Sequence, residues 1–170
     1  MSKVYQKVEL TANIMIIVIA LLIGGILVQK YFLALPVASN QPLRMQPVIG
    51  AKMNVLDVDW SQQPKTLVLA LQTGCHFCNE SAPFYKRITQ TVQNKNVKLV
   101  AVFPTSKEES AAHLSELGLQ QIEVKQSSLG NLQISGTPTL ILINDKGEIT
   151  NYWVGKLTPD REIEVLNQLQ

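Results

Sequence analysis

The chain has 170 residues, a formal net charge of +2 at pH 7, two cysteines and two histidines. So small a net charge, without a long basic run, argues against binding to nucleic acid. A structural zinc site normally takes four ligands. Supplying them here would take both cysteines and both histidines, and His76 lies between the cysteines, so we expect no metal site.

The N-terminal part of the chain is more apolar than the rest. Leu10–Val28 holds 19 residues without a charge, close to the about 20 residues that a helix needs to cross a bilayer. We predict a transmembrane anchor over residues 10–35, after a cytoplasmic N-terminus of residues 1–9. Lys3 and Lys7 favour this orientation, which makes the rest of the chain extracytoplasmic, and periplasmic in a Gram-negative cell. A cleaved signal peptide is the alternative, but its apolar region would be unusually long.

The anchor is followed by a linker and then by one folded domain. Residues 36–50 carry three prolines and show no helical or strand period, which predicts an extended linker. Residues 51–170 are long enough for one domain with its own hydrophobic core. A short first strand is expected at Asn54–Val58. Thr66–Leu71 is a continuous apolar run, typical of a central strand that is covered on both faces.

A helix and a further strand are predicted next. From Cys78 to Val92 apolar residues recur at steps of three and four, which indicates a helix. Pro83 is expected to kink this helix, because proline lacks a backbone N–H and its ring crowds the preceding turn. Val97–Phe103 is predicted to form the next strand.

The second half of the domain carries start and stop signals for further elements. Ser106 and Glu109 form a capping box, and Gly118 ends the helix that they open. The other predicted elements are a brief strand at Ile122–Lys125, a short helix at Ser127–Leu132, strands at Thr139–Ile143 and Glu148–Trp153 joined by a turn at 144–147, and a last helix that starts at Thr158 and Pro159. Helical crossovers join parallel strands and the hairpin is antiparallel, so the order predicts an α/β fold with a mixed sheet.

Both cysteines lie in the motif Cys75-His76-Phe77-Cys78, between the predicted central strand and helix. Cysteines at i and i+3 of a helix start can close a disulfide with little backbone movement. The helix dipole and free N–H groups there lower the pKa of the first thiol from about 8.5, and the thiolate is the reactive form. The pair therefore indicates a redox switch. An inert structural disulfide is the alternative, but so short a loop constrains the unfolded chain little.

With these elements, the chain resembles the thioredoxin superfamily. It is most similar to membrane-anchored, extracytoplasmic thiol–disulfide oxidoreductases of the TlpA/ResA type. The resemblance covers about residues 47–170. It rests on the strand–CHFC–helix order with Pro83 five residues beyond Cys78, on Gly136-Thr137-Pro138-Thr139 before an apolar strand, and on the turn at 144–148 followed by Gly155.

The resemblance implies a thioredoxin-like fold, in which helices flank a central mixed sheet, and a mechanism. Cys75 is expected to attack a partner protein and Cys78 to resolve the mixed disulfide. Thr137–Pro138 is expected to be a cis peptide that lies against the disulfide and lets the Thr137 backbone pair with an extended substrate. The implied partners are protein thiols and disulfides, with a membrane electron carrier as a further candidate. No cofactor is expected beyond the Cys75–Cys78 disulfide.

Three residues near the cysteines are expected to modulate the site. His76, if protonated, stabilises the Cys75 thiolate and favours oxidase or isomerase work; otherwise it points to solvent. Phe77 is expected to pack beside the site or to form an apolar docking surface. Glu80 lies one residue before the position where reductase-like relatives carry a glutamate. That shift rotates it by about 100° around the helix, which favours a solvated side chain over a proton acceptor for Cys78.

The chain differs from the family at two further positions, and two other functions are alternatives. Thioredoxins carry a buried aspartate where this chain has Leu69, and a tryptophan often precedes the first cysteine, where this chain has Gly74. Both changes weaken the case for strong reductase activity. A redox-inactive interaction module with the same fold is the main alternative. A peroxiredoxin-type peroxidase is less favoured, because Thr73 lies two residues before Cys75 rather than three.

Overall fold

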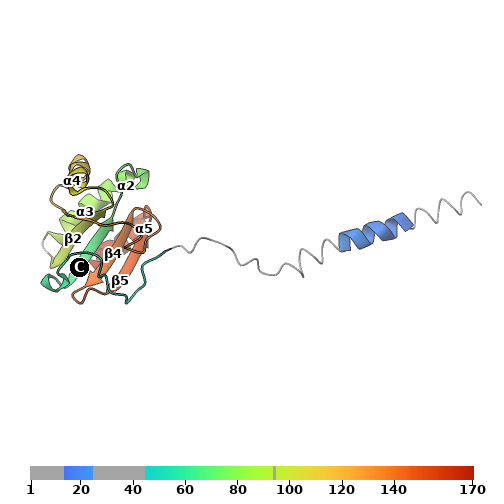
Figure 1. Ribbon diagram of the computed structural model, residues 1–170, viewed down its shortest axis with the longest axis horizontal. Coiled ribbons are helices and arrows are strands. Elements are labelled where there is room, and N and C mark those ends of the chain that lie inside the picture. Colours follow the sequence, from blue (N-terminus) through green and yellow to red (C-terminus); the bar gives the residue numbers. More distant parts are fainter. Residues whose placement is uncertain (1–13, 25–44, 94) are drawn as a thin grey trace, which may run out of the picture. The chain divides into compact units, whose positions relative to one another are not determined.

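The computed structural model describes residues 14–24, 45–93 and 95–170. The chain divides into two units, residues 1–43 and 44–170 (Figure 1). Residues 14–24 are helical. Across the described residues, no helix is both long and apolar enough to cross a membrane. The predicted cytoplasmic N-terminus at residues 1–9 lies outside the described residues, as do most of the predicted anchor and most of the predicted linker.

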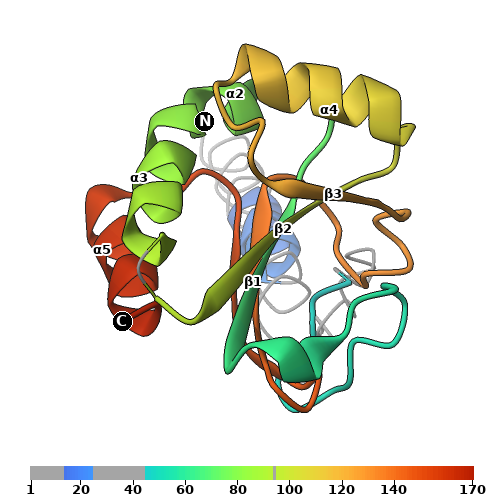
Figure 2. The same cartoon turned by 90° about the vertical axis from the view of Figure 1, so that its left-hand side faces the viewer.

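The second unit is built on a five-stranded mixed sheet with the strand order β3-β2-β1-β4-β5 (Figure 2). The strands are β1 Lys65–Ala70, β2 Val97–Phe103, β3 Glu123–Gln126, β4 Thr139–Asn144 and β5 Ile149–Val154. β1, β2 and β3 are mutually parallel, whereas β4 runs antiparallel to both β1 and β5. The predicted parallel crossovers and the antiparallel hairpin are therefore confirmed. As expected for a central strand, Leu67 to Ala70 are fully buried.

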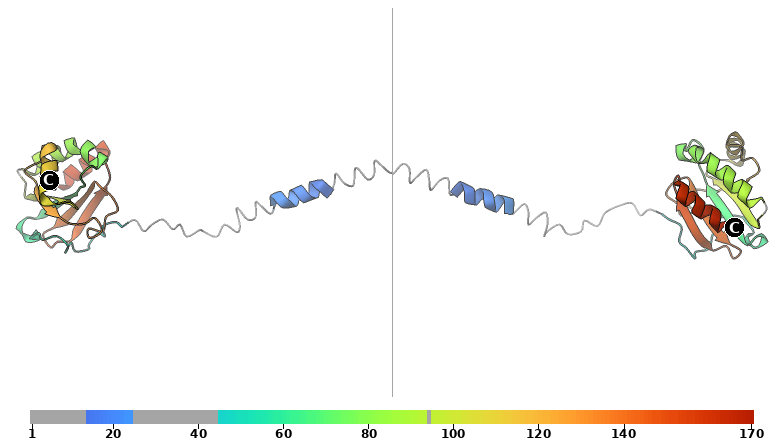
Figure 3. Two further views of the ribbon diagram at one scale, coloured as in Figure 1. Left: turned by 45° about the horizontal axis from the view of Figure 1, so that its top comes forward. Right: turned by 180° about the vertical axis from the view of Figure 1, so that it is seen from behind.

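The helices are η1 Trp60–Gln62, α2 His76–Glu80, α3 Ala82–Val92, α4 Lys107–Glu116 and α5 Pro159–Gln168. α3 and α5 lie side by side on one face of the sheet (Figure 3). The main core lies beneath them and includes Leu69, Cys78, Tyr85 and Val165. α2 and α3 are separate, with Ser81 between them and Pro83 in the first turn of α3. The single helix with a kink at Pro83 that was predicted from Cys78 to Val92 is therefore two helices, interrupted at Ser81.

The opposite face of the sheet is covered by coil, where two predictions were wrong. Asn54–Val58 is not a strand: the chain bends at Val55, and the isolated bridge that joins this segment's neighbourhood to the sheet lies earlier, between Lys52 and Glu148. Met53 and Leu56 are both buried against this face, and a spacing of three does not fit the alternation of a strand.

The predicted helix at Ser127–Leu132 is a series of turns. The Ser128 hydroxyl accepts a hydrogen bond from the backbone N–H of Asn131, and the N–H of Gln133 bonds to the carbonyl of Gly130. These local bonds compete with helical ones. The coil that they shape leads to residues 136–138, beside the cysteines.

Candidate functional site

The two cysteines form a disulfide at the start of α2, with their Cα atoms 5.2 Å apart. Gly74 precedes them with a φ of +76°, a left-handed conformation that suits glycine and turns the chain from β1 into the helix. Cys75 is the N-cap residue, and its Sγ accepts a hydrogen bond from the Cys78 N–H at 3.2 Å. The outer sulfur therefore lies where α2 presents a free N–H group.

The two sulfurs differ in access. Cys78 is fully buried, whereas Cys75 is only partly buried. A partner protein can therefore reach the sulfur of Cys75 but not that of Cys78. An attacking Cys75 and a resolving Cys78, the roles expected from the sequence, require such a difference in access.

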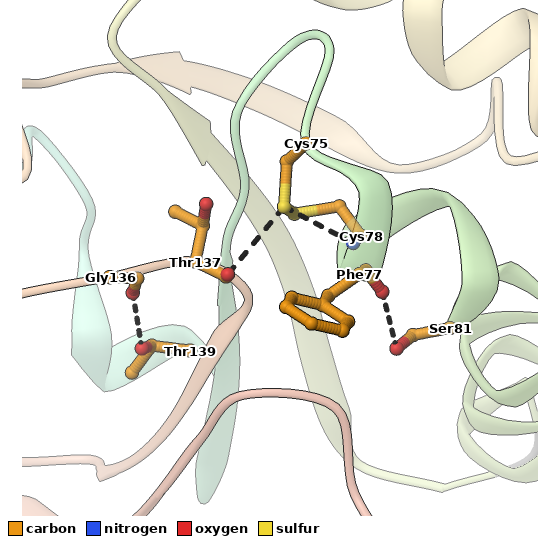
Figure 4. Close-up of a disulfide and its surroundings, with 7 residues drawn as sticks. All are labelled: Cys75, Phe77, Cys78, Ser81, Gly136, Thr137 and Thr139. Atoms are coloured by element: carbon orange, nitrogen blue, oxygen red, sulfur yellow. Dashed lines mark hydrogen bonds between the residues drawn. A yellow bond between two sulfur atoms is a disulfide. The ribbon is translucent and has the colours of Figure 1, made fainter.

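A loop that lies 62 residues away in the sequence meets the disulfide (Figure 4). The Thr137–Pro138 peptide is cis, as the resemblance implied. The carbonyl oxygen of Thr137 lies 3.5 Å from Cys75 Sγ. The loop is held on both sides of this contact: Thr139 Oγ1 donates to the carbonyl of Gly136 at 2.8 Å, and the Gly155 N–H donates to the carbonyl of Pro138 at 2.7 Å. Thr137 itself is partly exposed.

His76 and Glu80 lie on the outer surface of α2. The His76 side chain is 76% exposed, and its Nε2 lies 3.2 Å from Glu80 Oε1. The other carboxylate oxygen of Glu80 accepts a hydrogen bond from Lys156 Nζ at 2.9 Å. This bond from Lys156 is the main reason that the pKa of Glu80 is lowered. Glu80 therefore lies at the surface, between the Lys156 ammonium and the His76 imidazole.

Phe77 is 54% exposed, and its ring lies beside the disulfide (Figure 4). The ring is tilted against that of His76, with 5.6 Å between the ring centroids. Val154, the residue before Gly155, is also 43% exposed. It is the register partner of Thr139 and so lies near the cis peptide. Two exposed apolar side chains therefore flank the parts of the site, Phe77 within the CHFC motif and Val154 across from the strand that follows the cis peptide.

The interior beneath the disulfide is apolar. Leu69 is fully buried in the same cluster as Cys78 and Tyr85. Burial raises the pKa of Tyr85 well above its ordinary value, so its hydroxyl stays protonated at neutral pH. Among the described residues, no aspartate or glutamate is buried. Within the same residues, no group of three or more histidine, cysteine, aspartate and glutamate side chains is placed to hold a metal ion.

Comparison with known proteins gives structural similarity only. No protein-family model matches the chain, and no curated protein matches its sequence. The thioredoxin domain of a thiol-disulfide oxidoreductase from Bacteroides vulgatus superposes with a TM-score of 0.59 at 15% identity, and covers 74% of this chain and 100% of its own. The chain has the thioredoxin fold.

Two further solved structures share this fold. A thiol-disulfide isomerase from Corynebacterium glutamicum has a TM-score of 0.55 at 17% identity, over 73% of this chain and 93% of its own. StoA from Bacillus subtilis has a TM-score of 0.53 at 18% identity, over 74% of this chain and 99% of its own. The thioredoxin-like fold that the sequence predicted is confirmed.

The structure brings four of the predicted site residues together: Cys75, Cys78, Thr137 and Pro138. It places Phe77 beside them and turns His76 and Glu80 toward solvent. Sequence reasoning missed Lys156, which lies 76 residues from its partner Glu80. The sequence gives one indication that Lys156 lies near the site: it directly follows Gly155, a residue that carries part of the resemblance.

Proposed function

We propose that the protein is a membrane-tethered thiol–disulfide oxidoreductase that exchanges disulfides with extracytoplasmic proteins through Cys75 and Cys78. The observation that carries the proposal is the disulfide itself. It joins a reachable sulfur at a helix start to a buried one, and the reachable sulfur lies 3.5 Å from the backbone of a cis-proline loop.

The reaction is a pair of sulfur exchanges. In the reduced protein, the Cys75 thiolate attacks one sulfur of a partner disulfide, and the other partner sulfur leaves as a thiolate that takes up a proton. Cys78 then loses its proton and attacks the Cys75 sulfur, which releases the second partner thiolate. The partner gains two electrons and two protons, and the Cys75–Cys78 disulfide is formed. The same steps in reverse oxidise a partner dithiol.

The partner is an extended segment of polypeptide around a cysteine. Thr137 supports this, because the residue is partly exposed and its backbone carbonyl lies 3.5 Å from the reactive sulfur. Phe77 on α2 and Val154 at the end of β5 offer exposed apolar side chains. We therefore expect partners with an apolar side chain next to the reactive cysteine.

The tether and its compartment rest on the sequence. The apolar segment at residues 10–35 acts as the anchor, with residues 1–9 in the cytoplasm and the thioredoxin-fold domain outside. A membrane electron carrier is then a second partner, one that returns the cysteines to their starting state. A membrane-impermeant maleimide applied to intact cells tests this arrangement, because it reacts with reduced Cys75 only if the domain is outside.

The peroxidase alternative is disfavoured by one contact. The Thr73 hydroxyl lies 3.4 Å from the Thr105 hydroxyl, which itself lies 2.9 Å from that of Ser110. Thr73 is thus part of a hydroxyl chain toward α4. No hydrogen bond between Thr73 and Cys75 is found among the residues described.

Trapping tests the proposed function. In full-length Cys78→Ala, Cys75 forms mixed disulfides that cannot be resolved. We expect species of higher mass on non-reducing gels of native membranes, abolished by dithiothreitol. The double variant Cys75→Ala, Cys78→Ala is the matched control and is expected to show none. Identical patterns for the two variants would overturn the proposal and favour a redox-inactive module.

A further inference from the structure

A chain of three charged side chains joins α2 to the loop after β5. Glu80 occupies the centre: one carboxylate oxygen lies 3.2 Å from His76 Nε2, and the other lies 2.9 Å from Lys156 Nζ. All three side chains are exposed, between 38% and 76%. Exposed pairs of this kind add little to folding stability. Their position relative to Cys75 points to a different role.

His76 and Lys156 each adjoin a residue that forms or holds the site. His76 directly follows Cys75. Lys156 directly follows Gly155, whose N–H binds the carbonyl of Pro138 at 2.7 Å, and this proline belongs to the cis peptide whose Thr137 carbonyl lies 3.5 Å from Cys75 Sγ. Glu80 is the only acidic side chain that an ion pair or hydrogen bond joins to His76 or Lys156 in the described residues.

We propose that Glu80 is a positioning residue for the CHFC site: it holds Lys156 in an ion pair next to His76 and so keeps the positive charge of Lys156 from stabilising a Cys75 thiolate. The inference deepens the proposed function and rests on it. A nearby cation that is left unpaired favours the thiolate, and a stabilised thiolate shifts the disulfide toward its reduced form. Glu80 therefore keeps the site less oxidising than its sequence Cys-His-Phe-Cys alone suggests.

Glu80→Gln and Lys156→Met are expected to have opposite effects on the stability of the Cys75 thiolate. Glu80→Gln leaves Lys156 uncompensated, which favours the Cys75 thiolate. Lys156→Met leaves the Glu80 carboxylate with only His76, which disfavours the thiolate at neutral pH. The double variant removes both charges, and its dithiol–disulfide equilibrium is expected to return close to that of the wild type. A merely structural role predicts changes of the same sign for both single variants. Comparing the single and double variants therefore separates a structural role of Glu80 from an electrostatic one.

The experiment is a redox titration of the full-length protein in detergent against glutathione. Glu80→Gln is expected to shift the dithiol–disulfide equilibrium about threefold to tenfold toward the dithiol, which is roughly 15–30 mV. Lys156→Met is expected to shift it the other way, by a similar factor. Both shifts are expected to shrink at 1 M salt, where the Debye length is about 3 Å.

Glu116→Gln is the matched control, because Glu116 pairs with a histidine, His113, on α4 at 3.7 Å. It is expected to leave the equilibrium unchanged. Shifts below twofold in Glu80→Gln and Lys156→Met, or shifts of the same sign, overturn the inference while the proposed function stands. A wild-type protein that does not exchange with glutathione overturns both.

Discussion

Replacing Leu69 by aspartate, with Leu69→Asn as the matched neutral control, tests whether the space beneath the disulfide is apolar. Leu69 is fully buried in β1, in one cluster with Cys78 and Tyr85. Losing the burial of a leucine costs about 1.5–3 kcal/mol, and an unpaired buried polar group costs about 1–3 kcal/mol more. Both variants are therefore expected to lose about 2.5–6 kcal/mol of unfolding free energy at low pH.

The two variants are expected to separate as the pH rises. Burial disfavours the carboxylate, so the pKa of the introduced aspartate is raised in the folded state above its unfolded value of about 3.9. Below the pKa of this aspartate in the unfolded state, Leu69→Asp is then as stable as Leu69→Asn. Leu69→Asp loses stability relative to Leu69→Asn as the pH rises through the pKa of the aspartate in the folded state. A rise of two units costs Leu69→Asp about 2.7 kcal/mol more than Leu69→Asn once the pH exceeds about 6.

Urea unfolding of the oxidised full-length protein, followed by tryptophan fluorescence from pH 3.5 to 7.5, measures this difference. Trp153 is buried in the same core cluster and reports its loss. If the free energies of Leu69→Asp and Leu69→Asn stay parallel across this range, the carboxylate is solvated or paired. The description of an apolar interior beneath Cys78 is then refuted.

Two matched pairs of substitutions test the local structure by thermal unfolding. Ser106→Ala is expected to cost about 1 kcal/mol, because its hydroxyl caps α4, whereas Thr158→Ala is expected to cost only a few tenths, because its side chain makes no capping bond. Gly147→Ala is expected to cost more than Gly155→Ala. Both glycines have a positive φ, but a Cβ at Gly147 meets Trp60 Cδ1 at 2.8 Å, whereas one at Gly155 meets no atom within 4 Å. A reversed order within either pair contradicts the structure.

The sequence predicts best where local pattern and tertiary packing agree. Val97–Phe103 was predicted with its observed bounds, because an apolar β-rich run there is also buried by helices on one face and coil on the other. Ser106 and Gly118 mark the ends of α4 through a side-chain cap and a φ of +71°. These signals act within a few residues, so they do not depend on the rest of the fold.

The failures lie where the second face of the sheet is closed by coil. Asn54–Val58 has strand-like residues, but its burial is decided by the sheet that it covers, not by a neighbouring strand. Local turn bonds override the helical pattern at Ser127–Leu132.

In the site, too, some features follow from local sequence and others from tertiary structure. The spacing of Cys75 and Cys78 is visible in the sequence, and the cis peptide at Thr137–Pro138 followed only from the resemblance. The ion pair between Glu80 and Lys156 is set by tertiary structure across 76 residues.

The most direct test of the central claim is the pH dependence of alkylation at each cysteine of the reduced full-length protein, resolved by mass spectrometry. Cys75 is expected to react first, with an apparent pKa below the about 8.5 of a free thiol, and Cys78 to react much more slowly. Equal rates, or a Cys75 that reacts only above the pKa of a free thiol, would contradict the assignment of Cys75 as the attacking sulfur.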